Sequence, residues 1–240
     1  MSALELRQVS KIYGTGPSEV RAVSGVDLTV ERGELVAIMG PSGSGKTTLL
    51  TIAGSLEQPT NGQVLVDGVD LASVSRSVQA QMRRRSIGYV FQDFNLLPGL
   101  TAVENVTLPL ELDGARARAA RATGLEAMEE LDVAELADRY PDELSGGERQ
   151  RAAIARAIVG KRRLLLADEP TGALDSVNGE AVMRLLWAAT KRGVAGVVVT
   201  HEAKLASWAD RVVFLRDGQV VDQTIAPPGP ESLLATGDPR

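Results

Sequence analysis

The stretch that decides the fold of this chain is Gly40-Pro41-Ser42-Gly43-Ser44-Gly45-Lys46-Thr47-Thr48. It follows an apolar run, Leu35–Met39, that predicts a strand, and it opens a stretch, Lys46–Ala53, that predicts a helix. Glycines let the backbone turn so that its N–H groups point at phosphate oxygens, and the helix N-terminus adds partial positive charge. We expect Lys46 to reach the β- and γ-phosphates of a nucleotide and the Thr47 hydroxyl to ligate Mg²⁺. The stretch therefore predicts a phosphate-binding loop.

Composition limits what else the chain can be. It has 240 residues, of which 44% are hydrophobic, so it can build a core and is not disordered throughout. Its 26 Lys+Arg against 31 Asp+Glu give a net charge of -5, which gives no sign of a whole-surface nucleic-acid footprint. With no cysteine and one histidine, the chain has no disulfides, thiolate metal sites, cysteine nucleophile or His-rich zinc site.

No part of the sequence predicts membrane insertion. The apolar runs are far shorter than the ~18 residues that span a bilayer, and the first residues show no basic segment followed by an apolar one. We therefore expect a chain without a spanning segment or signal peptide, which reaches a membrane only through a partner.

Apolar runs bounded by Gly, Pro and Asp predict the strands. We expect them at Leu4–Val9, Val26–Val30, Leu35–Met39, Val64–Val66, Ile87–Phe91, Leu164–Ala167, Val197–Thr200, Arg211–Leu215 and Val220–Gln223. Several of these runs are unbroken, which is typical of parallel strands buried on both faces. The N-terminal strands and the hairpin-like stretch 62–68 predict a small antiparallel sheet beside the parallel one.

Helices fill the rest. Glu148–Val159 and Glu180–Lys191 read as helices, and the stretch from Thr101 to Arg139 is helix-rich, with no strand predicted between Phe91 and Leu164. The sequence therefore predicts an α/β fold: a mainly parallel sheet, an antiparallel β subdomain and an inserted α-helical subdomain. We expect the run Arg83-Arg84-Arg85 to be a solvated helix end.

A second chemical signal lies at the end of the predicted strand Leu164–Ala167. This strand delivers Asp168 to the C-terminal edge of the sheet, where open α/β sheets bind ligands. A nucleotide-binding loop needs such a carboxylate to hold the magnesium shell. Glu169 comes next and is expected to act as the general base for an attacking water.

A third signal is Leu144-Ser145-Gly146-Gly147-Glu148-Arg149-Gln150. Ser145 with Gly146 and Gly147 at a helix start forms another anion-binding end. One nucleotide does not need two phosphate-binding loops from one chain. The economical solution is two copies of the chain, head to tail, each offering this loop to the nucleotide of the other.

These motifs resemble those of the nucleotide-binding subunits of ABC transporters over nearly the full length. The phosphate-binding loop matches Walker A, Leu164–Glu169 matches Walker B, and Leu144–Gln150 matches the ABC signature. The resemblance implies further site residues: the Q-loop glutamine Gln92, Asp175 in the D-loop 172–175, the switch histidine His201, and Tyr13 as the aromatic that stacks on adenine. It implies ATP and Mg²⁺, with Thr47, Gln92 and Asp168 at the metal and Lys46, Gln92, Glu169 and His201 in catalysis.

The resemblance also implies a domain plan. The chain is expected to be one ATPase domain, with a RecA-like P-loop core plus antiparallel β subdomain at 1–92 and 161–225. The helical subdomain with the signature would cover 93–160, and 226–240 would be a loose tail.

The segment 92–110 is similar to ATPases of the MacB/LolD type, whose partners are integral permeases of the MacB and FtsX kind. That implies ATP-driven lipoprotein, peptide or drug export at the cytoplasmic face of the membrane, with the permease docked near residues 92–105. One alternative is the ATPase of a solute importer, and another is a cell-division ATPase of the FtsE kind. The compact, cysteine-free gap between Walker A and the signature argues against DNA-acting relatives with long insertions.

Overall fold

The computed structural model describes residues 2–172 and 174–225. Its larger sheet has the strand order β10-β9-β3-β8-β7-β6. These strands are β3 (Leu35–Met39), β6 (Ile87–Val90), β7 (Leu164–Asp168), β8 (Ala195–Val199), β9 (Arg211–Arg216) and β10 (Gln219–Ile225). All neighbours pair in parallel except β10, which runs antiparallel to β9.

The second sheet is antiparallel, with the order β2-β1-β4-β5. It contains β1 (Ser2–Tyr13), β2 (Val20–Glu31), β4 (Asn61–Val66) and β5 (Val69–Asp70). Asp67 and Gly68 join β4 to β5 with φ values of 50° and 77°, which is the geometry of a tight two-residue hairpin turn. The antiparallel β subdomain is therefore confirmed.

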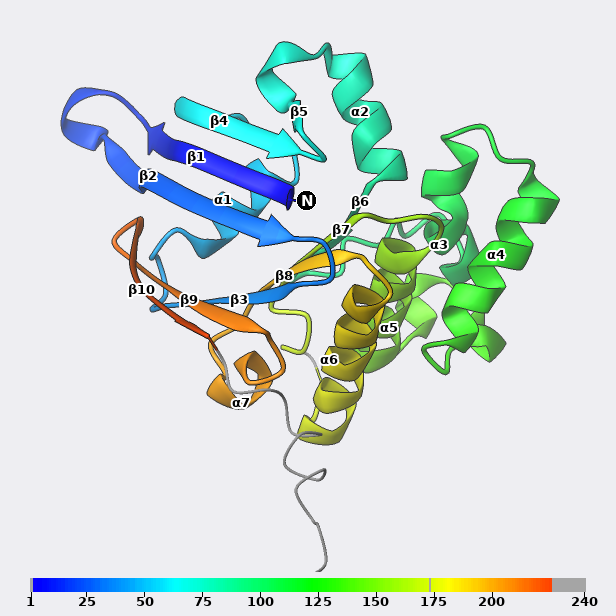
Figure 1. The fold of residues 1–240 in the computed structure, drawn as a ribbon. Coiled ribbons are helices and arrows are strands. Elements are labelled where there is room, and N and C mark those ends of the chain that lie inside the picture. The colour runs from blue at the N-terminus through cyan, green and yellow to red at the C-terminus, as the bar shows by residue number, and fades with distance from the viewer. Residues whose placement is uncertain (1, 173, 226–240) are drawn as a thin grey trace, which may run out of the picture.

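Helices lie on both faces of the larger sheet (Figure 1). They are α1 (Lys46–Ala53), α2 (Arg76–Arg85), α3 (Ala102–Glu111), α4 (Ala117–Glu129), α5 (Gly146–Ile158), α6 (Ser176–Lys191) and α7 (Ala203–Ala206). Short 3₁₀ turns lie at Gly16–Ser18, Leu71–Ser73, Ala134–Leu136 and Pro141–Glu143. Helix α3 packs on α4 and α5, and no described residue between β6 and β7 is in a strand. The predicted α/β fold with a helical subdomain is confirmed.

Two hydrophobic cores lie on opposite faces of the larger sheet. Strand β3 divides its side chains between them: Leu35 and Ala37 join the core under α3, α5 and α6, whereas Val36 and Ile38 join the core that also holds α1 and the antiparallel sheet. This alternation explains why β3 reads as an unbroken apolar run. It also fixes the loop after β3 rigidly, because the strand is packed on both faces.

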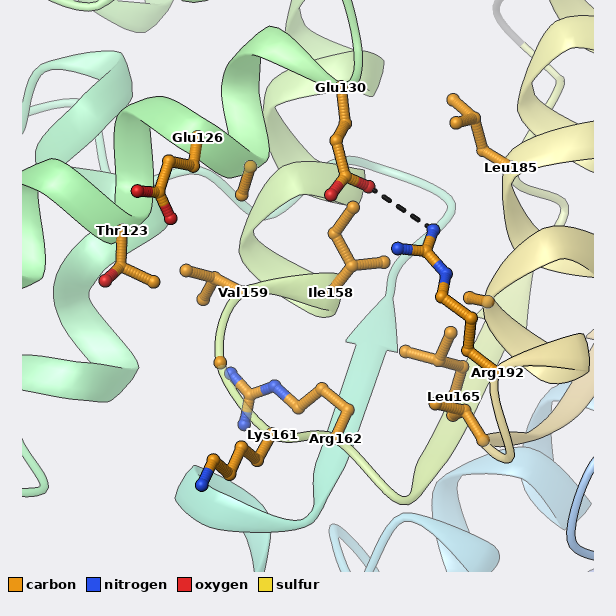
Figure 2. A pocket seen from close by; sticks show the side chains of 14 residues that line it. Thr123, Glu126, Glu130, Ile158, Val159, Lys161, Arg162, Leu165, Leu185 and Arg192 are labelled. Atoms are coloured by element: carbon orange, nitrogen blue, oxygen red, sulfur yellow. Dashed lines mark ion pairs between the residues drawn. The ribbon is translucent and has the colours of Figure 1, made fainter.

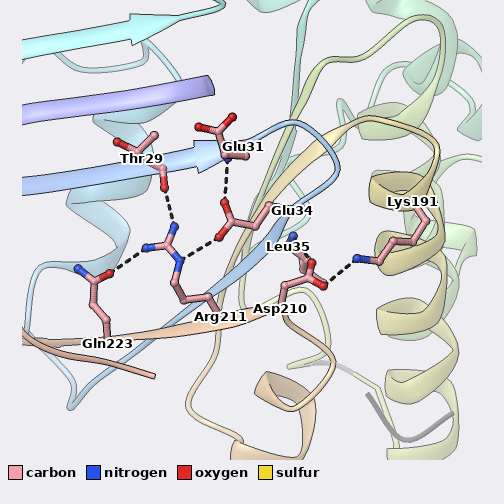
Figure 3. A network of polar contacts seen from close by, with 8 residues as sticks. All are labelled: Thr29, Glu31, Glu34, Leu35, Lys191, Asp210, Arg211 and Gln223. Carbon is pink, nitrogen blue, oxygen red and sulfur yellow. Dashed lines mark hydrogen bonds and ion pairs between the residues drawn. The ribbon is translucent and has the colours of Figure 1, made fainter. Parts of the chain in front are cut away.

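A polar network joins the two sheets at one edge (Figure 3). Arg211 at the start of β9 donates to Glu34 (2.9 Å), to the Thr29 carbonyl of β2 (2.5 Å) and to Gln223 of β10 (2.8 Å). Beside it, Asp210 accepts from the Leu35 backbone N–H (2.8 Å). These bonds hold the antiparallel sheet against the strand that carries the phosphate-binding loop.

The structure corrects one expectation. Arg83-Arg84-Arg85 is not a solvated helix end: Arg83 and Arg84 are half-buried, and Arg83 donates to the Ser55 carbonyl (2.9 Å). Arg85 alone is exposed, and it pairs with Asp113 (2.7 Å). These cations lie at the C-terminal end of α2, where the helix dipole favours positive charge.

The predicted tail 226–240 lies outside the described residues. Within the residues that the structure describes, no helix combines the length and the apolar character needed to cross a membrane.

Candidate nucleotide-binding site

The predicted phosphate-binding loop connects β3 to α1 and is wedged between neighbouring strands. A Cβ atom on Gly45, whose φ is 98°, would lie 2.0 Å from the Ala22 carbonyl of β2. A Cβ on Gly40 would lie 2.0 Å from the Leu215 carbonyl of β9. The two glycines are therefore required by close backbone approach. Lys46 folds over the loop and donates to the Gly40 and Pro41 carbonyls, both at 2.9 Å.

The loop forms one side of a cavity of about 440 Å³. The other walls come from the C-terminal ends of β7 and β8, from the segment after β6, and from β2. The lining residues are Val20, Arg21, Ala22, Gly40, Ser42, Gly43, Gly45, Lys46, Thr47, Thr48, Gln92, Asp168, Glu169, Val199 and His201. The structure thus brings together Lys46, Thr47, Gln92, Asp168, Glu169 and His201, which are far apart in the sequence.

Asp168 is the buried carboxylate of this cavity, with 4% of its surface exposed. Burial raises its pKa, and a hydrogen bond from Thr47 opposes that shift. Its Oδ1 atom is buried without a hydrogen-bond partner among the described residues. An unpaired carboxylate oxygen beside a threonine hydroxyl is a hard-oxygen donor set of the kind that Mg²⁺ prefers. Thr47 and Asp168 therefore fit a magnesium ion.

Glu169 follows directly and takes a φ of 47°, in the left-handed region. Its backbone N–H donates to the Val199 carbonyl (3.0 Å), so this conformation is held by the neighbouring strand. The carboxylate contacts His201 Nδ1 at 2.9 and 3.0 Å. That hydrogen bond raises the pKa of His201, whose ring is 68% exposed and reaches into the opening of the cavity.

The signature residues lie elsewhere. Ser145 caps α5 in a capping box with Glu148: the Glu148 backbone N–H donates to Ser145 Oγ (3.3 Å), and the Ser145 N–H donates to Glu148 Oε2 (2.7 Å). That backbone hydrogen bond lowers the pKa of Glu148. Ser145, Gly146 and Gly147 are not among the described residues that line the cavity. Within one chain the two anion-binding ends are therefore separate.

Tyr13 and Asp175 also lie outside the cavity lining. The Tyr13 hydroxyl donates to Glu57 (2.6 Å) and also interacts with the Thr48 side chain, and the centre of its ring lies 5.1 Å from Lys11 Nζ. Asp175 accepts a hydrogen bond from the Asn178 backbone N–H (2.9 Å) at the start of α6. Ala173, in the middle of the predicted D-loop, lies outside the described residues.

The sequence did not reveal every wall of the cavity. Arg21 and Ala22 line it from β2, a strand of the antiparallel sheet. Nothing in the local sequence points to them, because their place is set by sheet packing between segments far apart in the chain. Only the three-dimensional structure, in which Gly45 lies against the Ala22 carbonyl, shows that β2 reaches this cavity.

A second cavity of about 330 Å³ lies between α4 and α6, away from these residues. Figure 2 shows Arg192 reaching from the end of α6 toward Glu130, with which it forms an ion pair at 3.6 Å. This pair links the helical subdomain to the parallel core across the cavity.

Comparisons with known proteins agree with this geometry. The family model "ABC transporter" matches residues 23–172. The lipoprotein-releasing system ATP-binding protein LolD of Shewanella frigidimarina is 44% identical over 231 residues, which is 96% of this chain and 96% of LolD. The macrolide export ATP-binding/permease protein MacB of Brucella melitensis is 42% identical over 221 residues, 92% of this chain and 34% of MacB.

A solved structure is similar over almost the whole fold. It is the dimeric, post-hydrolysis state of the ATP-binding cassette MJ0796 of Methanocaldococcus jannaschii, bound to ADP and Pi. The TM-score is 0.89 at 40% identity, covering 93% of this chain and 99% of that one. The chain therefore belongs to the ABC transporter family, as one of its ATP-binding, ATP-hydrolysing subunits.

Proposed function

We propose that this chain powers an export-type transporter, with an integral permease of the MacB/FtsX kind, from the cytoplasmic face of the membrane. Its cargo class is a lipoprotein, a peptide or a drug. The observation that carries this proposal is the similarity to LolD over 96% of both chains, together with the similarity to the ATP-binding part of MacB. The segment 92–110, on which the sequence resemblance rests, runs from Gln92 in the nucleotide cavity through most of α3.

ATP is proposed to lie between the phosphate-binding loop of one copy and the Ser145 end of α5 in the other. Two features support this head-to-tail arrangement. The two anion-binding ends do not share a cavity within one chain, and the similar MJ0796 structure is dimeric. We infer that Gly146, Gly147 and Asp175 act across the same interface.

Each site residue has a proposed task. Lys46 neutralises the β- and γ-phosphates, helped by backbone N–H groups of the loop after Pro41 and by the α1 N-terminus. Glu169 accepts the proton of the attacking water, and His201, held by Glu169, contacts the γ-phosphate. Tyr13 supports the adenine ring. Positioning and electrostatic stabilisation supply most of the acceleration, as in phosphoryl transfer generally.

Thr47, Asp168 and Gln92, the last of which lies in the loop after β6, are the residues that would hold Mg²⁺. When bound, the ion neutralises charge that develops on the phosphates. The buried, unpaired Oδ1 of Asp168 supports this assignment.

The catalytic proposal is tested with Lys46→Ala and Glu169→Gln. Lys46→Ala should lose productive MgATP binding. Glu169→Gln should bind MgATP and form a stable dimer but turn over ~10²–10⁴ times more slowly, the usual contribution of a positioned base. Light scattering with and without MgATP reports the dimer, and phosphate release reports turnover. A Glu169→Gln chain that stays monomeric at saturating MgATP would refute the head-to-tail site.

The permease proposal is tested at Leu97. Asn105, which is buried, holds the loop before α3 by accepting from the Leu97 N–H (2.7 Å) and donating to the Leu97 carbonyl (3.0 Å). The Leu97 side chain is left 44% exposed, whereas Val103 belongs to the core. Leu97→Asp should abolish recovery of the chain with permease-containing membranes while leaving MgATP binding intact. Leu112→Asp, at a residue 62% exposed beyond the other end of α3, is the matched control.

A further inference from the structure

The loop after Gln92 contains an unusual turn. Phe94 and Asn95 have φ values of 60° and 52°, so two successive non-glycine residues are left-handed. This region is unfavourable for L-residues and most unfavourable for bulky ones such as Phe94. The turn therefore persists because neighbouring groups hold it.

Arg156 of α5 supplies one of those groups. Its Nη1 donates to the Asn95 carbonyl (2.6 Å) and its Nη2 donates to the Phe94 carbonyl (2.7 Å). The planar guanidinium thus bridges the two left-handed residues with a pair of charge-assisted hydrogen bonds. Burial lowers the pKa of Arg156 to about 10, so the side chain is still charged at neutral pH.

Arg149 supplies the second group. Its guanidinium lies 5.5 Å from the centre of the Phe94 ring, within the range of a cation–π contact. It also donates to the Leu144 carbonyl (2.7 Å), directly before the Ser145 cap. Arg149 and Arg156 are seven residues apart and so lie on one face of α5, both turned toward the same loop.

Helix α5 therefore connects two sites. Its N-terminus carries Ser145, Gly146 and Gly147, the end proposed to meet the ATP of the partner copy. Its Arg149 and Arg156 hold the loop that starts at Gln92, which lines the ATP cavity of its own copy. A helix is a rigid element, so a displacement of its N-terminus moves both arginines with it.

We propose that Arg149 and Arg156 are positioning residues that hold the turn at Phe94–Asn95 and thereby make the place of Gln92 in one ATP site depend on the signature helix serving the other. This inference rests on the proposed head-to-tail dimer. It predicts that the two ATP sites are coupled: occupation of one sets Gln92 in the other.

The test is a double-mutant cycle measured as ATP turnover by the full chain. The variants are Gln92→Ala, Arg156→Met and the combination, with Arg118→Met on the exposed face of α4 as the control. Arg156→Met should lower kcat on the order of 10- to 100-fold, the loss expected when a catalytic group is misplaced by about 1 Å. Binding of ATP to the monomer without Mg²⁺ should change by less than about twofold, because Lys46 and Thr47 are untouched.

The decisive result is non-additivity. If Arg156 acts through Gln92, then Arg156→Met should cost no further activity in the Gln92→Ala background. Losses that multiply, or an Arg156→Met chain with the parental kcat, would overturn the proposal. In the wild type, turnover should rise sigmoidally with ATP, and Arg156→Met should lower the Hill coefficient toward the value that ATP-dependent dimerisation alone produces.

Two further measurements separate positioning from folding. Arg156→Lys keeps the charge but lacks the planar guanidinium that donates to two carbonyls at once. The kcat of this variant should therefore lie between those of wild type and Arg156→Met. Amide hydrogen exchange should accelerate at residues 93–97 in Arg156→Met and not elsewhere in the helical subdomain; loss of protection throughout would mean a purely structural role and would overturn the proposal. Failure of Lys46→Ala to abolish turnover would instead refute the proposed function.

Discussion

Replacing Asp168 by asparagine should stabilise the ligand-free protein and abolish its stabilisation by MgATP. The carboxylate is 4% exposed, its Oδ1 has no partner, and burial is the largest cause of its raised pKa. An ionised, incompletely paired buried group destabilises the fold by ~1–3 kcal/mol. The amide removes the charge but leaves its own N–H groups unpaired, so we expect a gain of ~1–2 kcal/mol, or about 2–8 °C in Tm for a chain of this size.

The pH dependence of the free energy of unfolding tests independently whether Asp168→Asn stabilises the protein. A raised pKa means that the folded state prefers the neutral carboxyl, so the contribution of Asp168 to stability is full below its unfolded pKa and is lost as pH rises through the folded value. The advantage of Asp168→Asn should therefore be present at pH 7 and shrink as pH falls toward 3.8, the ordinary Asp value.

Thermal unfolding of wild type and variant, with and without MgATP, measures both effects. Saturation at 100 times Kd should raise the stability of wild type by ~2.7 kcal/mol and that of the variant far less. Asp142→Asn, at an exposed position, is the control. A ligand-free Asp168→Asn chain that unfolds below wild type at pH 7 would refute the reasoning that burial dominates at this site.

Three other predictions follow from named contacts. The hydrogen bond to Glu169 raises the pKa of His201, so the ring stays protonated above the ordinary pH range of histidine. The rate of MgATP turnover should therefore fall at a pH above that range, and this alkaline fall should disappear in His201→Gln. An alkaline fall that survives in His201→Gln would contradict the role given to His201. Glu148→Gln should strengthen the MgATP-dependent dimer of the Glu169→Gln chain, because it removes a negative charge from the end of α5 that is proposed to meet phosphate. Light scattering over a protein dilution series measures the strength of the dimer. A weaker dimer would contradict this prediction. Arg211→Ala should lower the free energy of unfolding by ~2–4 kcal/mol, because it removes hydrogen-bond partners from Glu34 and from a β2 carbonyl. Urea unfolding measures the loss, with Arg118→Ala at an exposed position of α4 as the control. A change no larger than that of the control would contradict the role given to the network.

The elements around the phosphate-binding loop were predictable because local and tertiary forces agree there. The strand Leu35–Met39 and the helix Lys46–Ala53 have the predicted bounds. The first two strands of the antiparallel sheet were not: β1 runs to Tyr13 and β2 starts at Val20, well beyond the predicted apolar runs. Pairing between them extends the strands through polar residues, and irregular register between Leu6 and Val9 breaks the alternation on which the prediction relied.

The site was predictable for motif residues and unpredictable for the groups that hold them. The sequence identifies Lys46 by its spacing from the loop glycines, and Asp168 and Glu169 by the apolar strand directly before them. Arg156 reads in the sequence as one more polar residue of a helix, because its carbonyl partners lie 61 and 62 residues away. The predicted domain limits at 92 and 161 stay a prediction.

The cavity between α4 and α6 bears on how the helical subdomain is hinged. The ion pair between Glu130 and Arg192 crosses this cavity, and the two side chains are 46% and 62% exposed. Such surface ion pairs contribute ~0–1 kcal/mol and are weakened by salt. The cavity already provides space beside α4, so a tilt of α4 toward α6 would meet this ion pair first. The helical subdomain should therefore be attached to the core less firmly beside α4 than along α5, and rising ionic strength should weaken the α4 side further.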